Sequence, residues 1–404
     1  MTNRRQFIQA TLGSTALVSL SMGVPEVLLG ASAKAIENRD EKILIVIQLS
    51  GGNDGLNTVV PYGNDEYYKN RFTLAIAREQ VQKINDQVGF HPSLSGFSEL
   101  LEQNQLSLIQ GVGYPNPNRS HFESMDLWHT AHRFQESSQL GWLGRCLGES
   151  IQGELPAVHY GGGKQPLALA TRKQPAVTIR SLDQFRLDMG ERNERLTRGI
   201  VSDMRQDRPV DNPLLGFVHE SASVALSTSQ RMESILDDDA TKKFPATRLG
   251  KKLAAVSRLI DSGLPTRIYY VTHEGFDTHS NQAAAHAALL TELGDASQAL
   301  MADLQEKGHS DRTLVMTFSE FGRRVRENAS RGTDHGSAAP LFLFGGRVRS
   351  GPLNQHPSLT DLDQGDLKFS TDYRSVYATV LEEWLGVESQ PVLGQQFEKL
   401  DLFV

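Results

Sequence analysis

One segment constrains the fold of this chain more than any other. Residues 42–49 read KILIVIQL, an almost unbroken apolar run that is rich in β-branched side chains. Such a run is typical of a strand covered on both faces, as in the parallel sheets of α/β proteins. It ends in SGGNDG at residues 50–55, a composition that predicts a sharp loop.

Similar apolar runs recur along the chain and alternate with helical patterns. Further strands are predicted at 106–111, 266–272, 313–318 and 341–344, with short strands within 156–181. Helices are predicted at 94–101, from Ser120 onward, over most of 191–261, at 281–307 and at 373–385. This alternation predicts a three-layer α/β/α fold with a mostly parallel central sheet. We expect strands 43–49, 266–272 and 313–318 to be neighbours at its centre.

The N-terminal residues have the pattern of an export signal. Arg4-Arg5-Gln6-Phe7-Ile8 is followed by a weakly apolar stretch and by Ala33-Lys34-Ala35, a small-x-small cleavage pattern. The stretch is too short and too rich in Ser, Thr and Gly for a bilayer span. Residues 1–35 are therefore predicted to be a twin-arginine signal peptide that engages the twin-arginine translocase. Residues 36–404 then form one periplasmic or extracellular domain, with a mostly helical insertion around 191–261.

Composition excludes several classes of function. The formal net charge is −7 and no basic, aromatic-rich stripe is present, so we expect no nucleic-acid partner. Nothing after residue 35 reaches the length of a membrane span, so no stable span is expected. Cys146 is the only cysteine, which excludes an intrachain disulfide and a multi-cysteine zinc site. We expect it to be a small buried apolar residue.

Polar side chains cluster where the predicted strands end. In doubly wound sheets, ligands bind beyond the carboxyl ends of the strands. Carboxylates and imidazoles that converge there could hold a divalent metal ion, whether zinc, calcium, magnesium or manganese. The candidate ligands are Asp54, Asp277, His279, Glu320 and His335.

Each candidate also has an ordinary structural interpretation. Asp54 could stabilise its Gly-rich turn, and Asp277 could cap the following helix. Glu320 could form a solvated ion pair with Arg323 or Arg324, as neighbouring charges commonly do. His335 could bond only to backbone. The set is a stronger indication than any member.

Ser120 is the candidate nucleophile. It stands at a predicted helix N-terminus, where free amides favour an anion, but an ordinary N-cap serine occupies the same position. With Glu123 it would form a capping box, and we favour the capping role over the nucleophilic one. No Gly-x-Ser-x-Gly elbow and no Gly-x-Gly-x-x-Gly loop is present, which argues against an α/β-hydrolase and a dinucleotide-binding fold.

Several motifs resemble one family of exported bacterial proteins, named domain of unknown function (DUF) 1501. The matching motifs are the leader, QLSGGNDGLNTVVPY at 48–62, NRSHFESMDLW at 118–128, FDTHSNQ at 276–282, TFSEFGRR at 317–324 and GTDHGSAAPLFLFGG at 332–346. The resemblance implies an alkaline-phosphatase-like, sulfatase-like fold without an established reaction.

By the same resemblance, Asp54 matches the first metal-binding Asp of that superfamily and Ser120 its nucleophile. Asp277, His279 and His335 match its later Asp and His residues. Two departures stand out: Glu320-Phe321-Gly322 replaces an expected Asp-His-Gly, and His279 follows Asp277 unusually closely. They favour one metal ion, or a harder metal than zinc, over a complete two-zinc site.

Two functions therefore remain open. The first is a metal-dependent hydrolase or transferase acting on a phosphate or sulfate ester of a small molecule or glycan. Asn53, Asn118, Arg323 and Arg324 would then bind the substrate. The second is a non-catalytic protein that binds an anionic ligand or glycan, with Phe321 marking lost chemistry.

Overall fold

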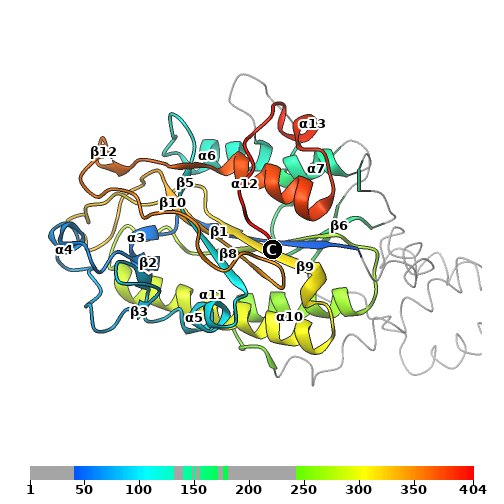
Figure 1. Ribbon diagram of the computed structural model, residues 1–404, viewed down its shortest axis with the longest axis horizontal. Coiled ribbons are helices and arrows are strands. Elements are labelled where there is room, and N and C mark those ends of the chain that lie inside the picture. The colour runs from blue at the N-terminus through cyan, green and yellow to red at the C-terminus, as the bar shows by residue number, and fades with distance from the viewer. Residues whose placement is uncertain (1–40, 132–139, 148–149, 152–154, 172–175, 181–242) are drawn as a thin grey trace, which may run out of the picture.

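The computed structural model describes residues 41–131, 140–147, 150–151, 155–171, 176–180 and 243–404 (Figure 1). A central sheet runs through this part of the chain, with helices packed on both faces. The predicted three-layer α/β/α fold is confirmed. Two small sheets lie outside it. One has the order β2-β4-β3, where β2 is Val59–Val60, β4 is Gly89–Phe90 and β3 is Gln82–Lys83, and the other pairs β12 (Leu362–Asp363) with β13 (Asp366–Leu367).

The order of the central sheet is β11-β5-β10-β9-β1-β8-β6-β7, with β14 also paired to β5. In that order the strands are β11 (Gly351–Pro352), β5 (Leu106–Gly113), β10 (Ala339–Gly345), β9 (Thr313–Phe318), β1 (Ile43–Ser50), β8 (Ile268–Glu274), β6 (Ala157–Tyr160) and β7 (Val177–Ile179), and β14 is Thr371–Asp372.

The three central strands are those that the sequence predicted. β1 pairs in parallel with β8 on one side and with β9 on the other. The register places Ser50 opposite Glu274 and Gln48 opposite Phe318, so the loops that follow all three strands leave the same edge of the sheet. β8 begins and ends two residues later than expected, because its last residues still pair with the end of β1. β10 alone is antiparallel to its neighbours, β9 and β5.

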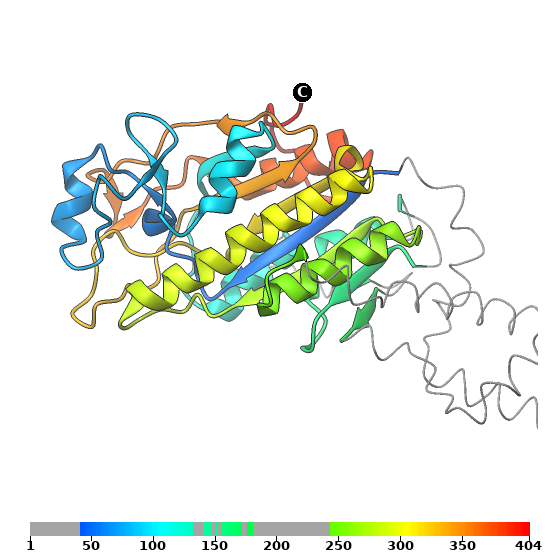
Figure 2. The ribbon, with the colours of Figure 1, turned by 90° about the horizontal axis from the view of Figure 1, so that it is seen from below.

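The apolar run of β1 faces two cores because side chains alternate between the faces of a strand. Ile43, Ile45 and Ile47 join the core under one helical layer, and Leu44 and Val46 join the other. The first layer holds α5 (Ser95–Glu102), α10 (Arg248–Asp261) and α11 (Gln282–Glu306), and Figure 2 shows α10 and α11 side by side on the sheet. The second holds α6 (His121–Thr130), α7 (Trp142–Cys146), α12 (Tyr373–Thr379) and α13 (Ser389–Leu393).

The helices begin and end close to the residues that the sequence predicted. α11 begins after Asn281, and Gly308 just beyond it adopts a φ of 74°. The helix predicted at 373–385 is α12 continued by a π-helical turn, and it stops at Gly386 with a φ of 69°. A positive φ is nearly strain-free for glycine, which explains both stops.

Some predictions fall partly or wholly outside the described residues. The signal peptide at 1–35 is one, and the helical insertion around 191–261 is described only from residue 243. Within the described part, no helix has the length and apolarity needed to cross a membrane. Cys146 is buried in the core, as expected.

Candidate metal centre

Asp277 lies at the centre of a group of histidines beyond the end of β8. Its Oδ1 atom is 3.0 Å from His279 Nε2, 3.2 Å from His335 Nε2 and 3.5 Å from His121 Nε2. The Nε2 atoms of His279 and His335 are 2.9 Å apart. Three imidazoles, one from the start of α6 and two from loops, thus direct the same ring atom at one carboxylate oxygen.

The other nitrogen of each imidazole is held by an oxygen acceptor. His121 Nδ1 lies 2.9 Å from Glu320 Oε1, His335 Nδ1 lies 2.8 Å from the carbonyl of Arg119, and His279 Nδ1 lies 3.4 Å from Asp334 Oδ1. Because carboxylates and carbonyls only accept hydrogen bonds, we assign the proton of each neutral ring to Nδ1. Each Nε2 lone pair then faces Asp277, the arrangement found when histidines bind a metal.

Burial and neighbouring charges shift the pKa values of three members of this group, Asp277, His335 and His121. Burial alone would raise the pKa of Asp277, but the adjacent Arg323, through its hydrogen bond and its positive charge, outweighs burial and the pKa is lowered to about 2. Burial lowers the pKa of His335, which favours its neutral form. The hydrogen bond to Glu320 raises the pKa of His121. Protons and a metal ion therefore compete most closely at His121.

The donor atoms fit a tetrahedral cation. His121, Asp277 and His335 form a group of three possible metal ligands whose ligand atoms all lie within 4.8 Å of one another. Ligands bound about 2.0–2.1 Å from a tetrahedral ion lie about 3.3 Å apart. The separations of 3.2 and 3.5 Å between the imidazoles and Asp277 match that spacing.

Asp54 does not join this group. It is fully buried and forms a two-pronged ion pair with Arg71, with Nη1 2.5 Å from Oδ2 and Nη2 2.9 Å from Oδ1. Gln282 Nε2 also donates to it, at 2.5 Å. Burial acts to raise its pKa, but the adjacent Arg71 outweighs burial and lowers the pKa to about 2. Asp54 thus has a guanidinium counter-ion where the sequence predicted a metal.

Glu320 reaches the site indirectly. It is almost completely buried, and its Oε1 accepts hydrogen bonds from the backbone N–H of Gly51, at 2.8 Å, and from His121. The next residue, Phe321, packs its ring against His121 and His335, with ring centres 4.9 and 4.5 Å apart. Phe321 thus forms an apolar wall beside the imidazoles, and Glu320 orients one of them.

Arg323 is sealed inside the site. Its side chain has no exposed surface, and its guanidinium donates to the backbone carbonyls of Gly51, Gly52, Phe276 and Thr333 and to Asp277 Oδ1, the last at 2.7 Å. These bonds hold Asp277 in place. The geometry does not support the predicted role of Arg323 in substrate binding, since its donors are already engaged. Arg324, by contrast, is 36 % exposed.

Ser120 is the N-cap residue of α6, but the predicted capping box is wrong. Its side chain makes no capping hydrogen bond, and Glu123 instead accepts from Asn118 Nδ2. The Asn118 side chain also accepts from the backbone N–H of Ser120 at 2.7 Å. Among the described residues, the Ser120 hydroxyl therefore has no hydrogen-bond partner, one residue before His121, while Asn118 shapes the turn.

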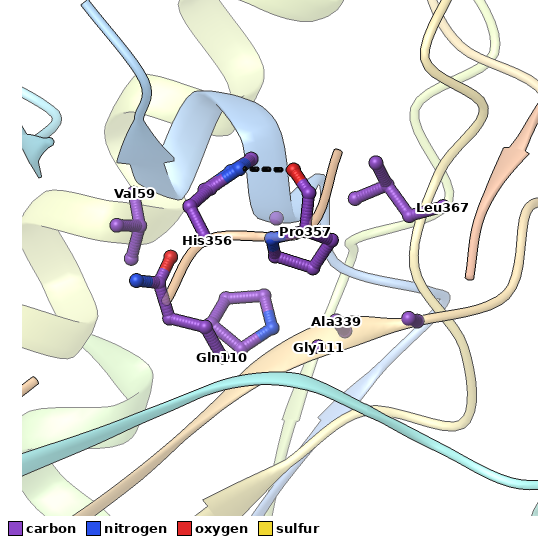
Figure 3. A pocket seen from close by; sticks show the side chains of 10 residues that line it. Val59, Gln110, Gly111, Ala339, His356, Pro357 and Leu367 are labelled. Atoms are coloured by element: carbon purple, nitrogen blue, oxygen red, sulfur yellow. Dashed lines mark hydrogen bonds between the residues drawn. The ribbon is translucent and has the colours of Figure 1, made fainter. Parts of the chain in front are cut away.

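Asn53 is buried rather than open to a substrate. Its Oδ1 accepts from Thr58 and His286, and its Nδ2 has no hydrogen-bond partner in the described part of the chain. A separate pocket, lined in part by Val59, Gln110 and His356, contains none of the clustered histidines; at its wall His356 donates to the Pro357 carbonyl (Figure 3).

The sequence interpretation missed His121. Its signal was present in the motif NRSHFESMDLW, next to the candidate nucleophile. A histidine at the first position of a helix has no spacing pattern that marks it as a ligand. Only the packing of α6 against the ends of β8 and β9 brings it to Asp277.

Comparison with known families resolves the relationship of the chain. Residues 41–383 match the family described as Protein of unknown function (DUF1501). The chain belongs to this family. The membership that the motifs indicated is confirmed, and no curated protein matches the chain.

Solved structures similar to this DUF1501 chain include members of the predicted superfamily. A PsFucS1 sulfatase from Pseudoalteromonas sp. is 13 % identical, with a TM-score of 0.39, covering 94 % of this chain and 75 % of its own. An alkaline phosphatase superfamily protein from Vibrio parahaemolyticus is 9 % identical, with a TM-score of 0.38 and coverages of 92 % and 76 %. The periplasmic domain of EcEptC from Escherichia coli is 9 % identical, with a TM-score of 0.36 and coverages of 89 % and 88 %. At such scores these similarities say nothing about reaction or substrate.

Proposed function

We propose that this protein is a hydrolase or transferase for phosphate or sulfate esters that works with a single divalent metal ion. One observation carries the proposal: the Nε2 atoms of His279, His335 and His121 converge on Oδ1 of the ionised Asp277 from 3.0–3.5 Å. Lone pairs facing an anionic oxygen repel it unless a cation or protons lie between them.

The donor set indicates which metal would bind. His121, His335 and Asp277 would hold it, and His279 Nε2 is placed to complete or adjust the coordination. Imidazole nitrogens suit zinc and other transition metals, whereas calcium and magnesium prefer sets made of oxygen atoms. Among the four metals considered from the sequence, zinc fits this site best.

Each residue then has a chemical task. When bound, the cation would supply Lewis acidity, polarising an ester oxygen. Ser120 Oγ would attack phosphorus or sulfur, so that a bond from Oγ to that atom forms as the bond to the leaving alcohol oxygen breaks, and the serine proton passes to the departing alcohol. Water, or an acceptor alcohol in a transferase, would then displace the phosphate or sulfate group from Ser120 and return a proton to Oγ. The free backbone amides in the first turn of α6 would stabilise the anionic group in place. Arg323 would hold Asp277 in position, and Phe321 would exclude water from one side of the imidazoles.

The experiment begins with the mature protein purified after export, because metal loading depends on that history. We expect about one zinc ion per chain by elemental analysis, with zinc binding lost in His335→Ala. A matched control is His309→Gln, since His309 pairs with Asp261 on α10. Absence of metal in the wild type, together with no zinc binding by calorimetry, would overturn the metal-enzyme proposal.

Hydrolysis is tested separately with p-nitrophenyl phosphate and p-nitrophenyl sulfate. Ser120→Ala should retain zinc but lose hydrolysis. Zinc binding without hydrolysis of either ester, but with binding of the free anions, would instead favour the non-catalytic anion-binding protein. The position of Phe321, which fills the place of an expected imidazole, favours this second function.

The cellular setting of this activity follows from residues 1–35. Export by the twin-arginine translocase would place the enzyme in the periplasm or outside the cell, where a small-molecule or glycan ester would be its substrate. That route carries folded proteins, which agrees with a metal centre loaded before export.

A further inference from the structure

We propose that Arg119 and Arg324 form a subsite beside the metal centre for a second anionic group of the substrate. This inference rests on the proposed function, and it narrows the substrate class. The substrate would carry an anionic group in addition to its scissile ester.

The two arginines converge on one buried carboxylate. Arg119 binds Oδ2 of Asp366 through Nε at 2.8 Å and Nη2 at 2.6 Å. Arg324 approaches the other oxygen, Oδ1, with Nε at 3.5 Å. Asp366 lies in β13 and its side chain is only 2 % exposed. Asp366, in the β12–β13 pair, thus holds both guanidiniums close together.

Both arginines are attached to the metal centre through their backbones. The carbonyl of Arg119 accepts the hydrogen bond from His335 Nδ1 at 2.8 Å. The backbone N–H of Arg324 donates to the carbonyl of Asp334, the residue before His335, at 3.0 Å. Arg119 also directly precedes Ser120. A group bound between the two guanidiniums would therefore lie next to the reacting ester.

The charge on this pair is only partly matched. The side chains of Arg119 and Arg324 are 38 % and 36 % exposed, so both can meet a ligand. Within the described residues, Nη1 of each arginine donates to no group, and Asp366 Oδ1 accepts no hydrogen bond. The charges of Asp334 and Asp363 reach this cluster, but neither forms an ion pair with Arg119 or Arg324. Two cations thus share one carboxylate.

Guanidinium groups select the chemistry of the occupant. Their planar N–H donors match the oxygens of phosphate, sulfate and carboxylate groups, and such charge-assisted bonds are among the strongest in proteins. The free Nη1 donors therefore suit an anionic oxygen better than a sugar hydroxyl.

The test uses the zinc-loaded protein with Ser120→Ala, so that no probe is turned over. Fructose 6-phosphate and fructose 1,6-bisphosphate are compared by calorimetry, because they differ by one phosphate. We expect the bisphosphate to bind about tenfold more tightly, a preference that Arg324→Ala should remove. Arg326→Ala is the matched control: Arg326 is exposed on the same loop, and it pairs with no group among the described residues.

The outcomes separate the two proposals. Equal binding of both probes by the parent protein, or a bisphosphate preference that survives Arg324→Ala, would overturn the subsite while leaving the metal enzyme intact. If Arg326→Ala removed the bisphosphate preference equally, the subsite would also be overturned, because the preference would then come from the overall positive charge of the loop and not from Arg324. Binding of neither probe by zinc-loaded protein would count against both proposals.

Discussion

Asp54 keeps its charge in the interior because Arg71 neutralises it. Both side chains are completely buried, and two hydrogen bonds join the guanidinium to the carboxylate. Arg71 also donates to the carbonyls of Arg324 and Val325, directly after Arg323. One ion pair therefore ties the loop after β1 to the loop that carries the metal centre.

Asp54→Asn should lower the free energy of unfolding by about 3–5 kcal/mol, because it leaves the Arg71 charge buried without its partner. Urea denaturation measures the loss. Asp65→Asn is the control, since Asp65 forms an exposed pair with Arg78, and it should cost at most about 1 kcal/mol. A folded Asp54→Asn protein of normal stability that had lost its zinc would show that Asp54 is a ligand after all.

The Asp54 carboxylate should also make the free energy of unfolding depend on pH in the acid range. Its pKa falls from 3.8 to about 2 on folding, so the folded state favours the ionised form. The resulting stability, about 2 kcal/mol, is fully present above pH 4 and is lost as the pH falls from about 4 towards 2. Urea titrations across that range should show this loss in the wild type and a smaller one in Asp54→Asn; parallel pH curves would refute it.

At the scale of elements, the metal centre is assembled where α6 meets the ends of β8 and β9. His121 is the first residue of α6, Asp277 follows β8, and Glu320 follows β9. Glycines allow the loops to press together: a Cβ on Gly332 would lie 2.2 Å from the backbone of His279. No single element could form the centre alone.

Glu320→Gln tests this assembly. Glutamine can still accept the hydrogen bonds from Gly51 and His121, so the fold should persist, but without a charge it makes His121 a weaker ligand. We expect zinc affinity to fall about 10- to 100-fold, as measured by competition with a chelator. Glu123→Gln, an exposed change on α6, the helix that carries His121, should have no effect on zinc affinity. Unchanged affinity in Glu320→Gln would separate Glu320 from the metal centre.

For the whole molecule, zinc should bind the native state much better than the unfolded chain, whose ligands lie far apart in sequence. Zinc at one hundred times its dissociation constant should therefore raise the free energy of unfolding by about 2.7 kcal/mol. Asp277→Asn should abolish this gain. Equal stabilisation of the wild type and Asp277→Asn in urea titrations would place zinc binding elsewhere.

Export is also a property of the whole chain. Replacing Arg4 and Arg5 by lysine should trap the full-length precursor in the cytoplasm, because the twin-arginine pair is the predicted recognition feature. Cell fractionation and immunoblotting measure the amount of precursor in the cytoplasm. A variant with Lys34→Arg, which leaves the Arg4-Arg5 pair intact, is the control. Normal cleavage of the Lys-Lys precursor would disprove this route.

The sequence by itself determined the layers of the fold and the edge of the sheet that carries the polar residues. Apolar runs such as 43–50 mark strands covered on both faces, and parallel strands place their carboxyl ends together. That local reasoning placed Asp277, His279 and His335 at this edge, and the structure brings these three side chains together; their binding of a metal stays a prediction. The family motifs gave the same positions.

Only the tertiary structure decided which side chain pairs with each carboxylate of the predicted site. The partner of Asp54 is Arg71, 17 residues along the chain. Asp277 pairs with Arg323 across 46 residues, and Glu320 pairs with His121 across 199. Strand periodicity fixes where a side chain leaves the sheet, but pairing at such separations depends on how loops pack. For that physical reason, the sequence could name carboxylates at the site but could not distinguish a metal ligand from a buried ion pair.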